Sequence, residues 1–314
     1  MVEYKAEGLC RSALTMTAAE LEDAFYANQI LQSTALAFDR THRLRLTLAG
    51  KPAYMEYNEC ADGIESGQVR DIAILTRVGR PTCFVIKKLP QEGCDYYLLS
   101  RREAQLRCRQ DYPDRLCPGD LLSCRVTHIE PFGAFCDVGC GISALLPIDC
   151  LSVSRIQSPA DRVHLGEDLT CVLKNRDSQG RLVLSLRELL GTWQENADQF
   201  DVGETVVGIV RSIEDYGIFI ELAPNLAGLA EYTDGVQLGQ PVSVFIKNIL
   251  PDKMKIKLMI VNRELSEPLR FPLQYSQTSG HISHWIYSTP QSPKQIETCF
   301  NEAFPSCTED DLLL

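Results

Sequence analysis

The sequence has 314 residues, 45% hydrophobic and 23% charged, with 16 prolines and 20 glycines, which is typical of two to four small globular domains and excludes a largely disordered chain. The formal net charge of −11 excludes strong non-specific attraction to phosphate, so a nucleic-acid partner would be held more by stacking than by charge. No run of about 18 apolar residues and no signal-peptide core occur, so we expect a cytoplasmic protein with no membrane partner.

The N-terminal third begins with a helix and continues as short strands. Thr17-Ala18-Ala19-Glu20 has the pattern of a capping box, which predicts a helix from there to about Asn28. The segments that follow are apolar or alternating and are separated by Gly, Pro, Asp and Asn, which indicates strands. The predicted strands cover residues 30–38, 43–48, 53–57, 71–76, 83–86 and 96–99. A helical stretch then runs to about Tyr112, before Pro113.

Two further blocks repeat this order of strands, a terminal Leu-Ser and a connecting helix. The second block ends in Leu184-Ser185, and its helical stretch passes through Trp193 to Phe200. The third block begins at about Val202 and runs to about Val261. We therefore divide the chain into an N-terminal tail with a helix, three barrel-sized blocks and an appendage, which are residues 1–26, 27–116, 117–200, 201–261 and 262–314.

The C-terminal segment differs in composition from the blocks before it. Gly280 to Tyr287 indicates an aromatic-rich strand, and Ser292-Pro293 predicts the start of a helix that reaches Phe300. The acidic end, residues 309–311, is expected to be frayed. We expect a small α+β appendage here.

The most informative feature is a repeat between residues 126–138 and 210–222, at an offset of 84 positions. Each copy centres on an aromatic residue, a glycine, an apolar residue and a phenylalanine, namely Phe132-Gly133-Ala134-Phe135 and Tyr216-Gly217-Ile218-Phe219. Side chains three positions apart on a regular strand point to opposite faces. Because glycine permits a bulge or a tight bend, we expect both rings of a copy to emerge on one face. Unpaired bases stack on such rings.

About five short strands per block predict a mainly β chain of tandem five-stranded OB-fold barrels joined by short helices. The second block also reads Val-x-x-Ile-x-x-aromatic-Gly-x-Phe-x-acid-Val and, later, Asp-x-x-Gly-Arg-x-x-Leu-Ser. This pattern resembles the S1 RNA-binding domain, which is repeated in the largest protein of the bacterial small ribosomal subunit. The resemblance covers Cys117 to Glu188 and Val202 to Val261. It implies a bacterial, ribosomal-protein-like RNA binder with three modules.

The resemblance also implies ligand positions on both barrels. They fall on Phe132, Phe135, Asp177 and Arg181 in the second block and on Tyr216 and Phe219 in the third, where Asp252 and Lys255 loosely replace the acid and the arginine. The histidine that the family often carries after its Gly-Leu step is Pro147 in one block and Glu231 in the other. The aromatic pairs are intact in both blocks.

Each of these assignments has a structural alternative. Phe135 and Phe219 would pack in a barrel core if they pointed inward. Lys174 and Arg181 are candidates for phosphate contacts, and the alternative is that they are solvated strand residues. Along the last strands of the third block the candidates for phosphate contacts are Lys247, Lys253, Lys255 and Lys257. Asp177 is expected to form a turn or an ion pair with Arg181, because Asp-x-x-Gly-Arg is a favourable hairpin sequence.

The first block aligns as a degenerate copy, in which Thr41 and Leu44 occupy the two ring positions. We therefore expect it to be structural or to bind a partner. A basic stretch follows it, with Arg101, Arg102, Arg107 and Arg109. We interpret this stretch as a solvated helix face, and phosphate contact is the alternative.

The sequence indicates no catalytic, metal or cofactor site. No Ser-His-acid order, phosphate-binding glycine loop or His-Glu-x-x-His helix occurs, and the five histidines are scattered without acid partners. His281 and His284, with Cys299 and Cys307 downstream, do not have zinc-site spacing. The 13 cysteines include no Cys-x-x-Cys pair, and we expect most to be small buried thiols, such as Cys124, Cys136 and Cys171.

The hypothesis from the sequence is non-catalytic binding of single-stranded, mRNA-like RNA by the second and third barrels, in connection with translation or RNA turnover and with the ribosome as a further partner. Two alternatives stay open. One is a protein-interaction scaffold with vestigial RNA binding, which the negative charge favours. The other is an accessory RNA-binding subunit of a ribonuclease.

Overall fold

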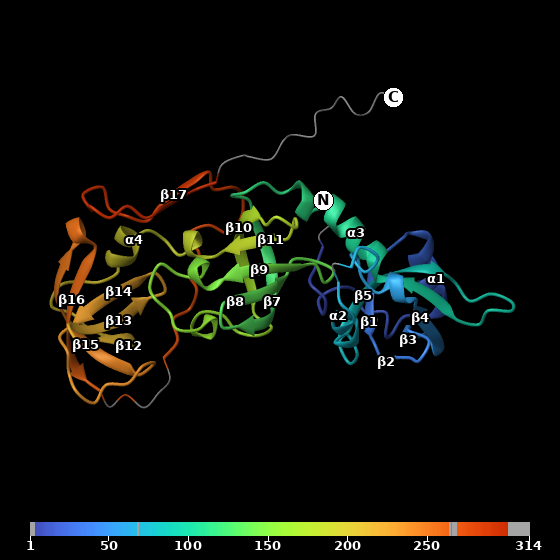
Figure 1. Ribbon diagram of the computed structural model, residues 1–314, viewed down its shortest axis with the longest axis horizontal. Helices are drawn as coiled ribbons and strands as arrows, with labels where there is room; N and C mark the ends of the chain where they lie inside the picture. Colours follow the sequence, from blue (N-terminus) through green and yellow to red (C-terminus); the bar gives the residue numbers. More distant parts are fainter. Residues whose placement is uncertain (1–3, 68, 264, 266–268, 301–314) are drawn as a thin grey trace, which may run out of the picture. The chain divides into compact units, whose positions relative to one another are not determined.

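The computed structural model describes residues 4–67, 69–263, 265 and 269–300. The fold is mainly β, as predicted, with two closed five-stranded barrels, one six-stranded sheet, one two-stranded sheet and few helices (Figure 1). The chain divides into two compact units. The first comprises residues 1–116, 124–127 and 136–144, and the second comprises residues 117–123, 128–135 and 145–314.

The first helix, α1 (Ala18–Tyr26), begins where the capping box predicts it. The Thr17 hydroxyl accepts a hydrogen bond from the Glu20 amide, and the Glu20 carboxylate accepts one from the Thr17 amide at 2.8 Å. Leu21 and Ala24 are buried in the core of the first sheet. The helix therefore covers that core with the one face that carries these apolar residues.

The first sheet has the order β1-β5-β6-β4-β3-β2. Its strands are β1 (Leu31–Thr34), β2 (Ala37–Phe38), β3 (Leu44–Leu48), β4 (Lys51–Met55), β5 (Pro81–Lys88) and β6 (Tyr97–Ser100). β1 pairs with β5, and β2, which follows closely in the chain, pairs with β3. β1 and β2 are thus two halves of one interrupted strand. With them joined, the strand order is that of the closed barrels described below.

Two helices lie at the edges of this module. The strand predicted at residues 71–76 is wrong, because the segment forms α2 (Asp71–Leu75), in which only Ile74 is buried. The apolar residues of so short a run fit a helical and a strand period equally well. The helix predicted to end at about Tyr112 is confirmed as α3 (Arg101–Asp111), and the Ser100 hydroxyl accepts a hydrogen bond from the Glu103 amide at its start.

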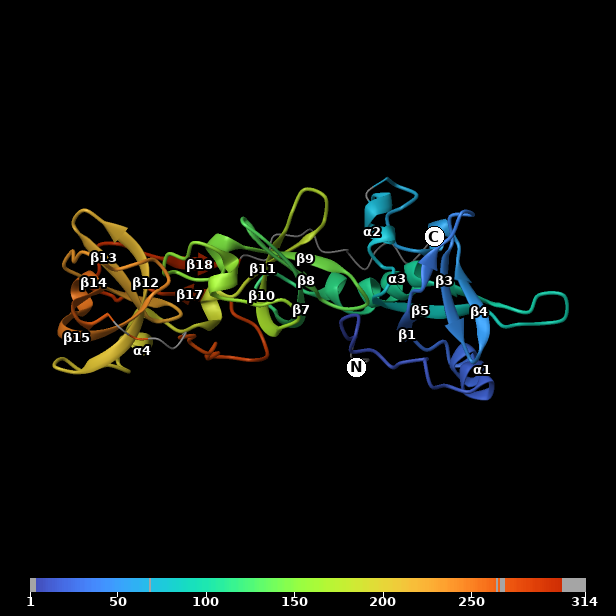
Figure 2. The same ribbon diagram turned by 90° about the horizontal axis from the view of Figure 1, so that it is seen from below.

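The second and third blocks form the two closed barrels. The second barrel consists of β7 (Leu121–Glu130), β8 (Gly133–Asp137), β9 (Ser143–Pro147), β10 (Asp168–Arg176) and β11 (Leu182–Ser185). The third consists of β12 (Thr205–Glu214), β13 (Gly217–Ala223), β14 (Leu226–Ala230), β15 (Pro241–Leu250) and β16 (Lys255–Asn262), which curl round one core in both views (Figures 1 and 2). The predicted connecting helix is divided into η5 (Arg187–Leu189) and α4 (Trp193–Ala197).

The core of the third barrel is lined by alternating strand residues. Val210, Ile218, Ile220 and Leu258 are almost completely buried. Trp193 of α4 joins the same core, so the connecting helix also serves as a plug for the barrel. The buried residues therefore fix the register of the strands, and the register determines which side chains face the solvent.

The C-terminal segment forms β17 (His284–Ile286) and β18 (Glu297–Cys299), which pair with each other. The helix predicted from Ser292 to Phe300 is wrong. The Ser292 hydroxyl does accept a hydrogen bond from the Lys294 amide, but the chain continues as a strand because pairing with β17 supplies its backbone partners. Residues 309–311 lie outside the described residues.

Two expectations from composition can be compared with the structure. Cys124, Cys136 and Cys171 are buried, as predicted. Among the helices of the described residues, none has the length and apolar character that a membrane span requires. This second observation concerns helices alone.

A buried ionic cluster connects the second and third barrels. Glu221 of β13 is fully buried, and its carboxylate accepts hydrogen bonds from Arg162, which precedes β10, and from Nε of Arg211 on β12 at 2.7 Å. Arg211 Nη1 also donates to the Asp161 carboxylate at 2.8 Å. Burial lowers the pKa of the Arg162 guanidinium, and the nearby Glu221 carboxylate opposes that shift.

We expect Glu221→Ala to destabilise the protein by about 3–5 kcal/mol, because it leaves the buried Arg162 guanidinium without its carboxylate partner and leaves Arg211 paired with Asp161 alone. Urea unfolding monitored by tryptophan fluorescence would measure the free energy of unfolding. Glu214→Ala is the matched control, since Glu214 pairs at 3.4 Å with the exposed Arg155 and should cost about 0–1 kcal/mol. Equal losses in the two variants would contradict the role given to Glu221.

Candidate nucleic-acid interface

The two rings of the second barrel are in contact at its surface. Phe132 lies in the turn between β7 and β8 and is 55% exposed, and Phe135 on β8 is half-buried. Their ring centroids are 6.0 Å apart with planes at 89°, an edge-to-face pair. Phe135 therefore supports Phe132, whose outer face is open to solvent.

The third barrel repeats this arrangement. Tyr216 is 70% exposed in the turn before β13, and Phe219 on β13 is half-buried. The centroids are 6.1 Å apart with planes at 87°. We refer to Phe132 with Phe135, and to Tyr216 with Phe219, as the ring pairs. Their equal geometry follows from the sequence repeat and from the same turn between the first two strands of each barrel.

Of the bulge or tight bend predicted at the glycine between the rings, the third barrel has the bend, because Gly217 directly follows the turn at residues 215–216 with a φ of +152°. The register shift lies on β12, between Val210 and Ser212, and not at Gly217. A Cβ on Gly217 would lie 2.5 Å from the carbonyl oxygen of Ala230, and one on Gly133 would lie 2.6 Å from that of Leu146. Each glycine is needed because a neighbouring strand approaches it closely.

A third ring of the second barrel was missed in the sequence. His128 on β7 lies 6.4 Å from Phe135 with planes at 27°, and its Nε2 lies 2.7 Å from the Glu130 carboxylate. His281 and His284 likewise contact Asp120 and Glu297. The expectation that the histidines lack acid partners is therefore wrong. His128 lies within the repeated segment, at the position where the third barrel has Ser212, and this position was the signal in the sequence that could have identified it.

Strand register shows which residues share the face of the Tyr216 ring pair. Neighbouring strands place Ser212, Phe219, Leu229, Lys257 and Asn248 opposite one another in one row across the barrel. Side chains paired in this way point to the same side of a sheet. Lys257 is exposed, and no acid among the described residues pairs with it. It is the cation in register with the ring of Phe219.

The second barrel has the same row with another composition. Leu145 pairs with Val183, and Val183 pairs with Asn175. Val183 thus stands where the third barrel has Lys257, and Asn175 stands where it has Asn248. The face of the second barrel relies on rings, and that of the third combines rings with a cation.

The remaining predicted residues of the second barrel have local partners. Lys174 is half-buried and lies 3.0 Å from the Cys150 sulfur. The ion pair predicted between Asp177 and Arg181 is confirmed, with Nε to carboxylate at 2.6 Å. Hydrogen bonds from the Arg181 amide and side chain hold the pKa of Asp177 below its usual value. Arg181 is nevertheless mostly exposed, so its guanidinium is accessible at the tip of the hairpin.

The predicted lysines of the third barrel differ in their surroundings. Lys247 forms an ion pair at 3.0 Å with Glu231, the residue at the family's histidine position. Lys255 is exposed at the start of β16 and pairs with Leu250, away from the row of Phe219. The row instead contains Lys257, which lies in the same basic stretch of sequence.

The alignment of the first module was one residue out of register. Leu44 is fully buried and pairs with Met55, as the buried Ile218 pairs with Ala230 in the third barrel. Leu44 is therefore a core residue, because its side chain points inward. Arg45, which pairs with Tyr54, stands at the position of Phe219.

In the basic stretch of α3, Arg101 is buried, and the other three arginines are partly exposed at the surface. Arg101 is buried and pairs with Glu7 at 2.6 Å, so it is an internal cation. Arg102, Arg107 and Arg109 each pair with acids, the closest of which are Glu65, Glu103 and Asp62 respectively. These partners already use the charges that a phosphate would need.

Two groups of side chains bring metal-binding atoms together in the described part of the chain. One is Cys10, Cys83 and Cys140, and the other is the exposed group His284, Glu297 and Cys299. The hydrogen bond with Cys140, together with burial, raises the pKa of Cys10 to about 12, although the hydrogen bond with Cys83 opposes the shift. Hydrogen bonds with Cys10 and Cys140, together with burial, also raise the pKa of Cys83. The prediction that no metal is bound stays a prediction.

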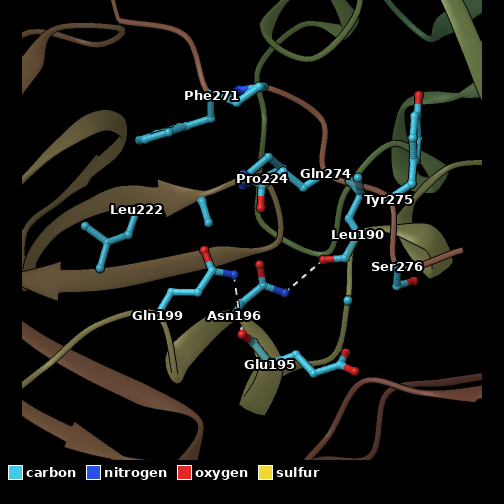
Figure 3. Close-up of a pocket in the computed structure, with 13 residues that line it drawn as sticks. Leu190, Glu195, Asn196, Gln199, Leu222, Pro224, Phe271, Gln274, Tyr275 and Ser276 are labelled. Carbon is cyan, nitrogen blue, oxygen red and sulfur yellow. Dashed lines mark hydrogen bonds between the residues drawn. The ribbon is translucent and has the colours of Figure 1, made fainter.

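A pocket of about 390 Å³ lies beside α4 (Figure 3). Asn196 projects toward it, and its amide already donates to the carbonyl oxygens of Leu190 and Thr192 at 2.8 Å. Phe271 and Tyr275 also line it, from the segment before β17. Among the described residues that line this pocket, none is a predicted site residue.

Comparisons with known proteins support the family resemblance of the second barrel. The family model of the S1 RNA binding domain matches residues 116–187, which confirms the resemblance for that block. Small ribosomal subunit protein bS1 of Streptococcus pneumoniae strain R6 is 30% identical over 181 residues, covering 52% of this chain and 45% of that protein. The protein of the same name from Leuconostoc lactis is 29% identical over 157 residues, covering 46% and 36%. The chain spans less than half the length of these relatives.

One solved structure matches over a larger share of the chain. It is a multidomain protein with nucleic acid binding domains from Streptococcus pneumoniae TIGR4, and the match covers 76% of this chain and 75% of that chain. The sequences are 13% identical, and the TM-score is 0.25.

Proposed function

Because residues 116–187 are an S1 RNA binding domain, we propose that the chain binds single-stranded RNA through both ring pairs and catalyses no reaction on it. The observation that carries this proposal is the doubled edge-to-face pair, with Phe132 and Tyr216 exposed at the two outer positions. An exposed ring held in place by a second ring is preorganised for stacking, so little side-chain entropy is lost when a base binds.

The ligand that fits these faces is unpaired. Both π-faces of a base inside a duplex are covered by its neighbours, so an exposed protein ring stacks only on a base that is free. The net charge of −11 supports the same choice, because double-stranded RNA is recognised mainly through its phosphates and 2′-hydroxyls. Stacking supplies affinity where the overall charge does not.

The buried ionic cluster supports joint use of the two barrels. Arg162 of one barrel and Glu221 of the other are held together in the second compact unit. An RNA strand that is bound to one ring pair then has a raised effective concentration at the other ring pair. We therefore propose that one RNA strand occupies both faces at once.

The relatives favour a role linked to translation. Because both matched relatives are small ribosomal subunit protein bS1, we propose that the ligand is mRNA-like, that the ribosome is a further partner and that the protein works in the cytoplasm. The net charge favours a second candidate, a protein-interaction scaffold with vestigial RNA binding. The experiments below distinguish these two.

We expect Phe132→Ala with Tyr216→Ala to weaken binding of a labelled, unstructured RNA of about 15 nucleotides by roughly 1–3 kcal/mol per ring. Fluorescence anisotropy at two salt concentrations would measure the dissociation constants. Tyr26→Ala is the control, since Tyr26 is 74% exposed on α1, outside either motif. Absence of saturable binding at low salt, or an unchanged affinity in the double variant, would support the scaffold instead.

We expect Lys257→Ala to weaken RNA binding more than Lys247→Ala, because Lys257 shares the row of Phe219 and Lys247 is paired with Glu231. Loss of one phosphate contact should reduce the slope of log affinity against log salt by about 0.7. The same anisotropy titration, repeated at several salt concentrations, gives that slope. A larger effect from Lys247→Ala would place the phosphate contact at Lys247 and contradict the role of Lys257.

A further inference from the structure

The first module has the same strand register as the two barrels, although no ring pair was recognised in its sequence. A register shift occurs between Ile86 and Lys88 on β5, between Leu173 and Asn175 on β10, and between Ile246 and Asn248 on β15. The irregularity stands at the same place in each module, on the strand that pairs with the last one. Positions on the three surfaces can therefore be equated one by one.

This register gives the first module an outward row of its own. Arg45 pairs with Tyr54, Tyr54 pairs with Leu98, and Leu98 pairs with Lys88. These residues stand where the third barrel has Phe219, Leu229, Lys257 and Asn248. The aromatic residue has moved one strand along, and a cation now stands on each side of it in the row.

Tyr54 is also part of a stack. The Arg43 guanidinium lies over its ring, 4.5 Å from the centroid, and the ring of Tyr96 meets it edge-on at 5.3 Å and 85°. The Thr41 hydroxyl accepts a hydrogen bond from Arg43 Nε at 2.8 Å, which fixes the plane of the guanidinium. About a quarter of the Arg43 side chain is exposed, at 27%. A guanidinium held in this way is a surface on which a base stacks.

The cations of the row are not neutralised locally. Within residues 4–67 and 69–263, no acid pairs with Arg45 or Lys88. The nearest ion pairs, those of Asp39 at 3.6 Å and Glu56 at 4.0 Å, both involve Arg43. Arg45 is exposed and Lys88 is half-buried. In a chain of net charge −11, two uncompensated cations beside a stacked tyrosine form a local site for phosphate.

We propose that the face formed by Arg43, Arg45, Tyr54, Lys88 and Tyr96 is a third binding face for single-stranded RNA. Arg45 and Lys88 contact backbone phosphates, and a base stacks on the Arg43 guanidinium above Tyr54. This goes beyond the proposed function, which uses the ring pairs of the other two barrels. An acidic protein segment would satisfy the cations, but it would leave the stack of Arg43 and Tyr54 without a partner, so RNA is favoured.

The test uses the full chain with both ring pairs removed, by Phe132→Ala, Phe135→Ala, Tyr216→Ala and Phe219→Ala. This background should retain measurable binding of the labelled 15-nucleotide RNA at low salt, with a steeper salt dependence than the intact protein. Adding Arg45→Ala and Lys88→Ala should weaken the remaining binding about tenfold or more and lower the salt slope by about 1.4, for two phosphate contacts.

The control in the same background is Arg80→Ala with Lys87→Ala, which removes the same charge outside the row. Arg80 directly precedes β5, and Lys87 on β5 pairs with Glu103 at 3.2 Å. It should leave the residual affinity unchanged. Tyr54→Leu, with folding checked by circular dichroism, should weaken binding without changing the salt slope, because it removes the stack and not a phosphate contact.

Three outcomes would contradict the proposal of a third binding face. They are equal effects of the two double variants on RNA affinity, an unchanged RNA affinity in Tyr54→Leu, and no residual RNA binding in the background. The last would leave the ring pairs as the binding site. Undiminished binding in the background would contradict the proposed function instead. If this face bound an acidic peptide and did not bind RNA, the partner would be a protein.

Discussion

The carboxylate of Glu221 is the interaction on which the arrangement of the second and third barrels depends. It is fully buried and is shared by Arg211 of its own barrel and Arg162 of the other. A charge in this position is tolerated only while both guanidinium groups remain in place, so the barrels are joined by a contact that separation would expose at high cost. The outward surface of each barrel is then free to serve a ligand.

The acid of the repeated motif is structural in both copies. Glu221 connects the barrels, whereas Asp137, 84 positions earlier, accepts hydrogen bonds from the amides of Glu7, Gly139 and Gly141. Burial raises the pKa of Asp137 to about 6. The residues of the repeated segment thus have two roles, since its acid forms contacts in the protein interior and its rings remain at the surface.

Much of this organisation could be predicted from local signals. The capping box, the terminal Leu-Ser and the aromatic-Gly-x-Phe repeat located the helix, the blocks and the ring pairs. Signals that depend on partners distant in sequence were missed. Residues 71–76 fit two periods, and β18 is a strand because β17 lies beside it. The alternation of Leu44, Leu46 and Leu48 would have corrected the first module, but Lys257 is linked to Phe219 only through pairing across β14.

The close strand contacts at Gly133 and Gly217 have a consequence for how such modules diverge. A carbonyl oxygen of the adjacent strand occupies the space that any side chain there would need. Change is therefore confined to the positions on either side, where the backbone geometry is indifferent to the side chain that it presents. In these two barrels the outer ring changes from phenylalanine to tyrosine while the glycine and the strand contact beside it stay the same, so one ligand contact can vary without a change of scaffold.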